Sequence, residues 1–217
     1  MRAVKGTSPV ITSPTFMAAD DETPTDCGTL PTCTVTREDG TALTAAVVTN
    51  DAAAGVYTAQ ITTTHTSRLD RLQIVWSGAV STYTQVYRQE VEVVSAHYVS
   101  VPEIRAQADM SDAVKFPTAL LASVRDTLAD IIDDYCRTPF VQRYAREQFV
   151  GTGQDHLYLS NTPVRELIAV TIDGTSQTIG NFVAYFADEP KQTRVLAGAL
   201  SALGFVLAAV GVYLVYL

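Results

Sequence analysis

Four aspartates within one short stretch are the groups of this sequence best suited to bind a cation. They are Asp126, Asp130, Asp133 and Asp134. Residues spaced by four lie on one face of a helix, so the first, second and fourth would line one helix edge. A metal site needs converging ligands, and no His or Cys shares that face except Cys136 at its end. The pattern therefore favours a solvated acidic face over a metal site.

The three cysteines do not form a metal-binding pattern either. The spacing of Cys27 and Cys33 fits no zinc motif, and no second pair follows. Two free thiols in one loop are the expected state of this pair, with a disulfide between them as the alternative.

The remaining polar groups offer no catalytic arrangement. The histidines, His65, His97 and His156, lie in separate segments without a nucleophile or carboxylate at a defined spacing, and are expected at the surface or at strand ends. The Gly-Thr-Gly turn at 151–153 lacks the lysine and the helix of a phosphate loop. The sequence therefore favours a protein that is not an enzyme and needs no cofactor. A hydrolase assembled from distant Ser, His and Asp residues has no local motif in its favour.

The chain of 217 residues carries a net charge of −8, divided equally between its halves. Residues 1–100 contain 6 basic and 10 acidic side chains, and residues 101–217 contain 9 and 13. Neither half has the basic surface that binding to nucleic-acid phosphates requires. The first residues lack the apolar segment of a signal peptide, which predicts a cytoplasmic origin.

The sequence changes character near residue 96, which predicts two domains, 1–96 and 97–217. In the first, short segments that alternate between apolar and polar residues are separated by turn signals. Strands are expected over 10–16, 32–36, 45–49, 56–62, 72–76 and 82–94, with a hairpin turn at Asp39-Gly40. This pattern is typical of an immunoglobulin-like β-sandwich, with Trp76 in its core.

The second half begins with strong helix signals. Ser100 and Glu103 form a capping box with Pro102 in the first turn, so a short helix to about residue 110 is expected. Pro117 begins a second helix over 118–136, which Thr138-Pro139 ends. One side of this helix is apolar, as expected where a helix packs against another surface. Its members are Leu120, Leu121, Val124, Leu128, Ile131, Ile132 and Tyr135.

Short strands are expected after that helix, over 140–150, 156–159, 167–172 and 181–186, with a hairpin turn at Asp173-Gly174. The whole chain is therefore expected to be α+β: a sandwich, then a small domain with two or three helices and a small antiparallel sheet. Residues 195–217 contain no charged residue. A run of this length is a transmembrane candidate, but glycines interrupt it, and a closing strand or a buried arm fits equally well.

The order of motifs after residue 100 resembles the head-to-tail connector (adaptor) proteins of tailed bacteriophages. The likeness begins with a capped short helix, a helix ending in Asp-Tyr-Cys-Arg-Thr-Pro-Phe (134–140) and a strand over 142–149. The turn at 151–153 and the segments 157–159, 162–164 and 170–174 follow in the family's order. The likeness covers about residues 100–186. Residues 195–209 depart from the family, although 213–216 resemble its closing strand. The first half is similar to the immunoglobulin-like modules of many phage structural proteins.

Membership of this family would imply a virion structural protein of the head-tail neck, assembled in the host cytoplasm. Its members form rings, typically of twelve subunits, that bind the portal protein and extend the DNA channel. The ring gives a stopper or tail protein a docking surface, and the genome passes without sequence-specific binding. The acidic face of 118–136 would then line the channel or a contact between subunits. The loops 151–156 and 174–180 would lie at interfaces. Separately from the resemblance, Arg137, Arg143 and Arg146 cluster after the acidic helix, and in a chain of acidic balance they are expected to form ion pairs between or within subunits.

The alternative hypothesis is a membrane-anchored binding protein. In it the β-sandwich presents a recognition surface, and residues 195–217 span a bilayer.

Overall fold

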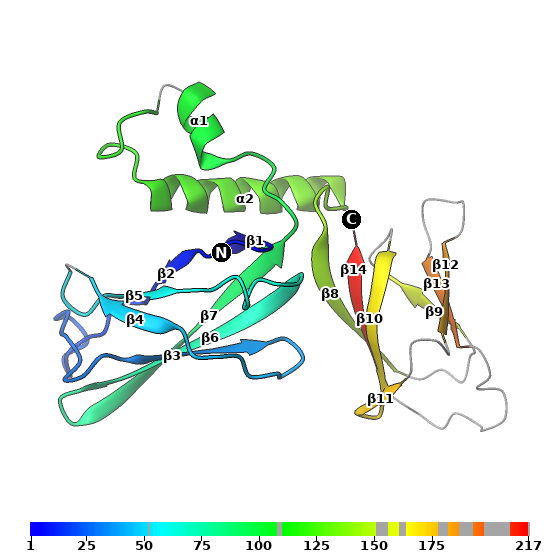
Figure 1. The fold of residues 1–217 in the computed structure, drawn as a ribbon, viewed down its shortest axis with the longest axis horizontal. Coiled ribbons are helices and arrows are strands. Elements are labelled where there is room, and N and C mark those ends of the chain that lie inside the picture. The colour runs from blue at the N-terminus through cyan, green and yellow to red at the C-terminus, as the bar shows by residue number, and fades with distance from the viewer. Residues whose placement is uncertain are drawn as a thin grey trace. The chain divides into compact units, whose positions relative to one another are not determined.

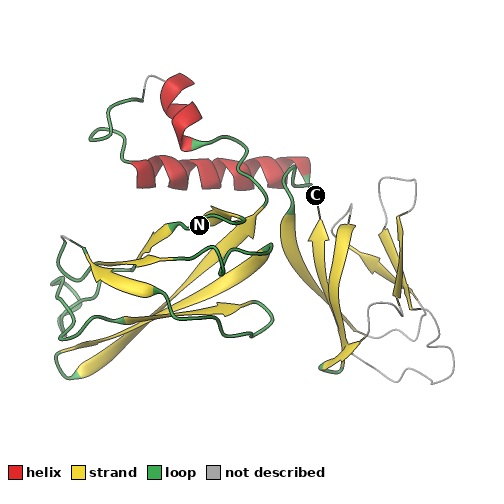
Figure 2. Ribbon diagram, in the orientation of Figure 1, coloured by secondary structure: helices red, strands yellow, loops and turns green. Residues whose placement is uncertain are grey.

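The computed structural model describes residues 1–51, 53–107, 110–150, 156–160, 164–177, 182–186, 193–197 and 209–216. The chain divides into two compact units, Met1–Ser95 and Ala96–Leu217, one residue from the division expected from the sequence. The described residues form fourteen strands and two helices (Figure 1, Figure 2). The predicted α+β class is therefore confirmed.

Two β-sheets make up the first unit. One has four strands in the order β1-β7-β6-β3, and the other has three in the order β2-β5-β4. Neighbouring strands are antiparallel except β1, which runs parallel to β7. The strands are β1 Arg2–Val4, β2 Val10–Thr12, β3 Thr32–Arg37, β4 Val47–Asn50, β5 Tyr57–Gln60, β6 Asp70–Val80 and β7 Tyr83–Val94.

One apolar cluster contains side chains from both of these sheets, so the sheets pack face to face in the manner of a β-sandwich. Along β6, buried residues alternate with accessible ones, which is the period of a strand with one face on a core. Trp76 is fully buried there, as predicted, and its indole N–H donates to Gln89 Oε1 at 2.8 Å. Phe16 packs edge to face on Tyr57 and Tyr87, with ring centroids 5.5 and 5.2 Å apart.

Proline explains one way in which the first unit differs from its predicted strands. The strand expected over 10–16 ends at Thr12, two residues before Pro14, and lies at a sheet edge as predicted. The Asp39-Gly40 turn forms, with Gly40 at φ +87° and its N–H donating to Arg37 O. The strand that follows the turn nevertheless pairs with β5, and only isolated bridges connect the segment after the turn to β3.

The second unit begins with two helices, α1 Val101–Gln107 and α2 Thr118–Cys136. The bounds of α2 are those predicted from the flanking prolines, and α1 packs against α2 (Figure 1). Two antiparallel sheets follow, in the orders β11-β10-β14-β8 and β12-β13-β9. Their strands are β8 Arg143–Val150, β9 His156–Leu159, β10 Val164–Ile172, β11 Thr175–Gln177, β12 Phe182–Phe186, β13 Thr193–Ala197 and β14 Ala209–Tyr216.

The charge-free run from residue 195 contributes the end of β13 to one of these sheets and the whole of β14 to the other. Thr193–Ala197 pairs with β12 and β9, and Ala209–Tyr216 pairs with β8 on one side and β10 on the other. A strand paired along both edges belongs inside a sheet, so residues 209–216 form a closing strand rather than part of a transmembrane helix. Residues 198–208 lie outside the described residues. Across the described part of the chain, no helix has both the length and the apolar content needed to cross a membrane.

The three cysteines are free thiols, so the disulfide considered for Cys27 and Cys33 does not form. Cys33 lies in the core of the first unit, and its burial raises the pKa of the thiol to about 11. Burial also raises the pKa of the Cys27 thiol. Cys136, at the end of α2, is exposed.

Candidate assembly surface on helix α2

The start of α2 is set by contacts from α1 and the loop between the helices. Arg105 Nη1 donates to Met110 O at 2.8 Å, while its Nη2 donates to Phe116 O at 2.7 Å and to Thr118 Oγ1 at 3.2 Å. Pro117 precedes the first helical residue and needs no N–H partner there. One guanidinium therefore ties α1 to the loop and to the first turn of α2.

The predicted capping box begins α1. The Ser100 N–H donates to Glu103 Oε2 at 2.7 Å, and the Glu103 N–H donates to Ser100 Oγ at 3.3 Å. The hydroxyl and the N–H of Ser100 hold the pKa of Glu103 below its usual value. Two otherwise unpaired backbone donors are satisfied, so α1 starts at a defined residue.

A buried carboxylate holds the C-terminal end of α2. Asp133 accepts a hydrogen bond from the Tyr98 hydroxyl. It also forms a hydrogen-bonded ion pair with Arg143 Nη1 at 2.7 Å. The same hydroxyl accepts from the Phe140 N–H at 2.9 Å. The helix ends at Cys136, and Arg137 caps it with a left-handed φ of +52°. The segment before α1, the end of α2 and β8 therefore meet at one carboxylate.

The buried side of α2 is not its apolar side. The buried residues are Leu121, Arg125, Ala129 and Asp133, spaced by four along the helix. Six of the seven apolar residues identified in the sequence are exposed, from 41% for Ile132 to 88% for Tyr135. We call these six the α2 stripe: Leu120, Val124, Leu128, Ile131, Ile132 and Tyr135.

The α2 stripe is a surface feature that a soluble chain rarely leaves uncovered. Single exposed apolar residues are common, but a continuous patch of several hundred Å² usually marks a contact with another molecule. The six residues lie on one side of a helix of 19 residues, so they form such a patch. The arrangement therefore suits docking of another protein surface.

The acidic residues flank this stripe, with one correction. Asp130 and Asp134 are exposed, as the solvated face requires. Asp126 is half-buried and accepts from Arg125 Nη2 at 2.8 Å and from Arg125 Nε at 3.1 Å. Asp133, in contrast, is buried, so the prediction that it belongs to an exposed acidic face is wrong. Asp133 is buried because it pairs with Arg143 of β8, and helix periodicity alone cannot reveal such a contact.

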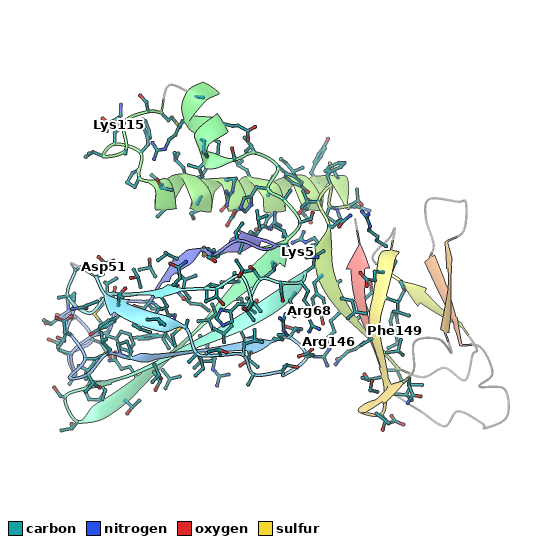
Figure 3. The ribbon with its side chains drawn as sticks, in the orientation of Figure 1. Lys5, Asp51, Arg68, Lys115, Arg146 and Phe149 are labelled. Carbon is teal, nitrogen blue, oxygen red and sulfur yellow. The ribbon has the colours of Figure 1, made fainter. Side chains whose placement is uncertain are left out.

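The three arginines after the helix lie in different environments. Arg143 forms an ion pair with Asp133 of the same chain. Of the two options for this arginine, a pair within a subunit or a pair between subunits, the structure shows the first. Arg137 is exposed at the end of α2. Arg146, labelled in Figure 3, is exposed on β8, where its backbone pairs in register with Tyr213 of β14. A contact of Arg137 or Arg146 with a neighbouring subunit stays a prediction. Of the two loops expected at interfaces, residues 151–155 and 178–180 lie outside the described residues.

One histidine differs from expectation. His65 is buried in the first unit, where Nδ1 accepts from the Thr62 N–H at 2.9 Å and Nε2 lies 2.7 Å from Thr44 O. A neutral ring that donates through Nε2 satisfies both contacts, so His65 joins two loops as a structural residue. Within the described residues, no three His, Cys, Asp or Glu side chains come close enough together to hold a metal ion.

Comparison with models of known protein families finds no match, and a search of curated protein sequences finds none either.

Replacing Asp133 with asparagine is expected to loosen the end of α2. The change removes the negative charge that pairs with Arg143 and leaves the Tyr98 hydroxyl with a weaker acceptor, at a cost of about 1–3 kcal/mol. Amide hydrogen exchange in the last two turns of α2 should then become faster.

Asp134→Asn is the matched control, because Asp134 is the exposed neighbour of the buried Asp133. Its exchange rates should stay close to those of the wild type. Equal rates in the two variants would show that the Asp133 contacts do not hold the helix end.

Proposed function

We propose that this chain is a virion structural protein, a subunit of a head-to-tail connector ring of a tailed bacteriophage. The ring docks on a portal protein, extends the DNA channel and presents a surface to a stopper or tail protein. The observation that carries the proposal is the α2 stripe, an apolar surface turned outward on the helix that the connector resemblance places in the ring. Such a protein works by shape and packing, with symmetric self-association.

The topology of the first unit supports an immunoglobulin-like domain. The orders β3-β6-β7 and β2-β5-β4 correspond to the C-F-G and B-E-D orders of a constant-type immunoglobulin sandwich. Three details depart from constant antibody domains. β1 pairs with β7 in the sheet that corresponds to C-F-G instead of joining the B-E-D sheet. Trp76 lies on the sixth strand rather than the third, and the unit has no disulfide. The order of the strands therefore supports the likeness to modules of phage structural proteins, while the core residues are this chain's own.

The second unit supports the connector likeness through the order of its elements. A capped short helix, a longer helix, the strand β8 and the β10-β11 hairpin follow one another as the resemblance implies. The segment 213–216 lies within β14, which pairs with β8 and β10 as a closing strand would. The net charge of −8 suits a ring through which DNA passes without being held.

Purification of the chain with and without its portal protein tests this proposal. Mass measurement and negative-stain microscopy should show closed rings, formed by the chain alone or on the portal. The expected particle has a central opening wide enough for duplex DNA. A chain that stays monomeric both alone and with portal would contradict the proposal.

A further inference from the structure

We propose that the α2 stripe is covered by a second copy of this chain in a head-to-tail contact. In such a contact the stripe of one copy meets a different surface of the next copy. This inference rests on the proposed ring and names the surface through which one subunit meets the next. The portal, a membrane and a nucleic acid are the other possible occupants of the stripe.

The area of the stripe is most of what one partner contributes to a standard protein–protein interface. Scaled by ordinary residue surface areas, the exposed fractions of its six side chains amount to roughly 600 Å² per chain, against the roughly 800 Å² that each partner contributes to a standard interface. Tyr135, the most exposed of the six, belongs to the residue types that most often anchor an interface. Contacts around the stripe would supply the remaining area.

The charges beside the stripe exclude two of the other occupants. Helices that lie on membranes carry Lys and Arg on their polar face, whereas this helix carries aspartates there. The same carboxylates repel nucleic-acid phosphates. The surface that covers the stripe therefore belongs to a protein, and it must meet Asp134 with a positive or neutral group.

The position of these aspartates also disfavours one way in which two copies could meet. Asp134 lies one turn from Ile131, so the acidic residues border the stripe along one flank. In a two-fold antiparallel pair of α2 helices, the acidic flank of one helix lies beside the acidic flank of the other. The aspartates of the two copies would then repel one another. A head-to-tail contact avoids this repulsion and is the type that closes rings. It also allows the exposed Arg137, just beyond α2, to approach the acidic flank of the next copy.

Two glutamate substitutions on the same helix test the contact. Leu128→Glu places a charge in the middle of the stripe, and Ser123→Glu places the same charge at an exposed position outside it. Sedimentation velocity over a range of concentrations measures self-association, and circular dichroism checks that both variants are folded. We expect the wild type to associate, Leu128→Glu to raise the dissociation constant by at least ~100-fold, and Ser123→Glu to change it by less than ~3-fold.

Each other outcome overturns the inference in a distinguishable way. Where the wild type is monomeric alone and forms rings only on the portal, the two variants are compared on those rings instead. Rings that persist unchanged in Leu128→Glu overturn this inference and leave the proposed function standing, because the stripe is then outside the contact. An associated species that stops at a two-fold dimer overturns the head-to-tail arrangement. Monomers both with and without portal overturn the inference and the proposed function together.

Discussion

Replacing Gly55 with alanine is expected to destabilise the first unit by about 4 kcal/mol, for two reasons that add. Gly55 has a φ of +70°, a left-handed backbone conformation that is strained for any residue with a Cβ atom. That Cβ would also collide with the Phe16 carbonyl oxygen and lie 3.1 Å from both the N and the O of Thr25. These are backbone atoms, and two backbone hydrogen bonds hold them in place. The Phe16 N–H donates to Gly55 O at 2.8 Å, and the Thr25 N–H donates to Phe16 O at 3.0 Å. They cannot move aside as a flexible side chain would.

Gly40→Ala is the matched control for this prediction. Gly40 has a similar φ of +87°, but a Cβ added there would meet no atom within 4 Å. Only backbone strain remains in this variant, so the free energy of unfolding is expected to fall by about 1–2 kcal/mol. Urea unfolding followed by fluorescence measures both variants, because Trp76 is the only tryptophan and lies in the core of this unit. Equal losses for the two variants would show that the contact with Phe16 has no effect of its own.

Local signals in the sequence were sufficient to place α2 and several turns. Pro117 and the Thr138-Pro139 pair mark the two ends of α2, because proline suits a first turn and restricts the residue before it. At Asp173-Gly174 both residues have positive φ, which matches the two-residue hairpin between β10 and β11. In each case the determining interaction spans only a few residues, so it can be read from neighbouring positions.

The face that α2 buries could not be predicted in the same way. Periodicity shows that Leu128 and Ile131 share a side of the helix, but not whether the protein's own core or another molecule covers that side. Asp133 was assigned to the solvated face because its partners, Tyr98 and Arg143, come from other segments. Sequence spacing contains no information on such contacts. The candidate surface was therefore recognised by residue type in the sequence and by exposure only in the structure.

Long-range pairing explains the elements that were missed. β1 has three residues, too few for a periodic pattern, and it forms because Arg2 to Val4 pair with Glu92 to Val94 at the other end of the unit. Arg2 Nε also donates to Glu92 Oε2 at 3.0 Å across this register. The contacts of His65 with Thr44 are another such case. These interactions depend on the completed sandwich rather than on any one segment.

A buried ion-pair network in the first unit carries the second large expected effect. Asp70 Oδ2 accepts from Arg37 Nη1 at 2.8 Å and from Arg68 Nε at 3.0 Å, and Asp70 Oδ1 accepts from the Arg71 N–H at 2.9 Å. The Asp70 side chain is 1% exposed and that of Arg37 is 9%, whereas that of Arg68 is 42% exposed. The network joins the end of β3 to the start of β6, so it fixes the register of these two strands.

Asp70→Ala is expected to cost about 3–5 kcal/mol, because it leaves the Arg37 guanidinium buried without its counter-charge. Arg68→Ala removes only the half-exposed partner and should cost less than about 1 kcal/mol. In the double variant Asp70→Leu with Arg37→Met, neither charge remains, so the loss should be clearly smaller than that of Asp70→Ala. Urea unfolding followed by Trp76 fluorescence compares these variants with the single variants Asp70→Leu and Arg37→Met. If the double variant loses as much stability as the two single variants together, the two charges are not coupled. The register of β3 on β6 would then have to come from apolar packing and backbone hydrogen bonds alone.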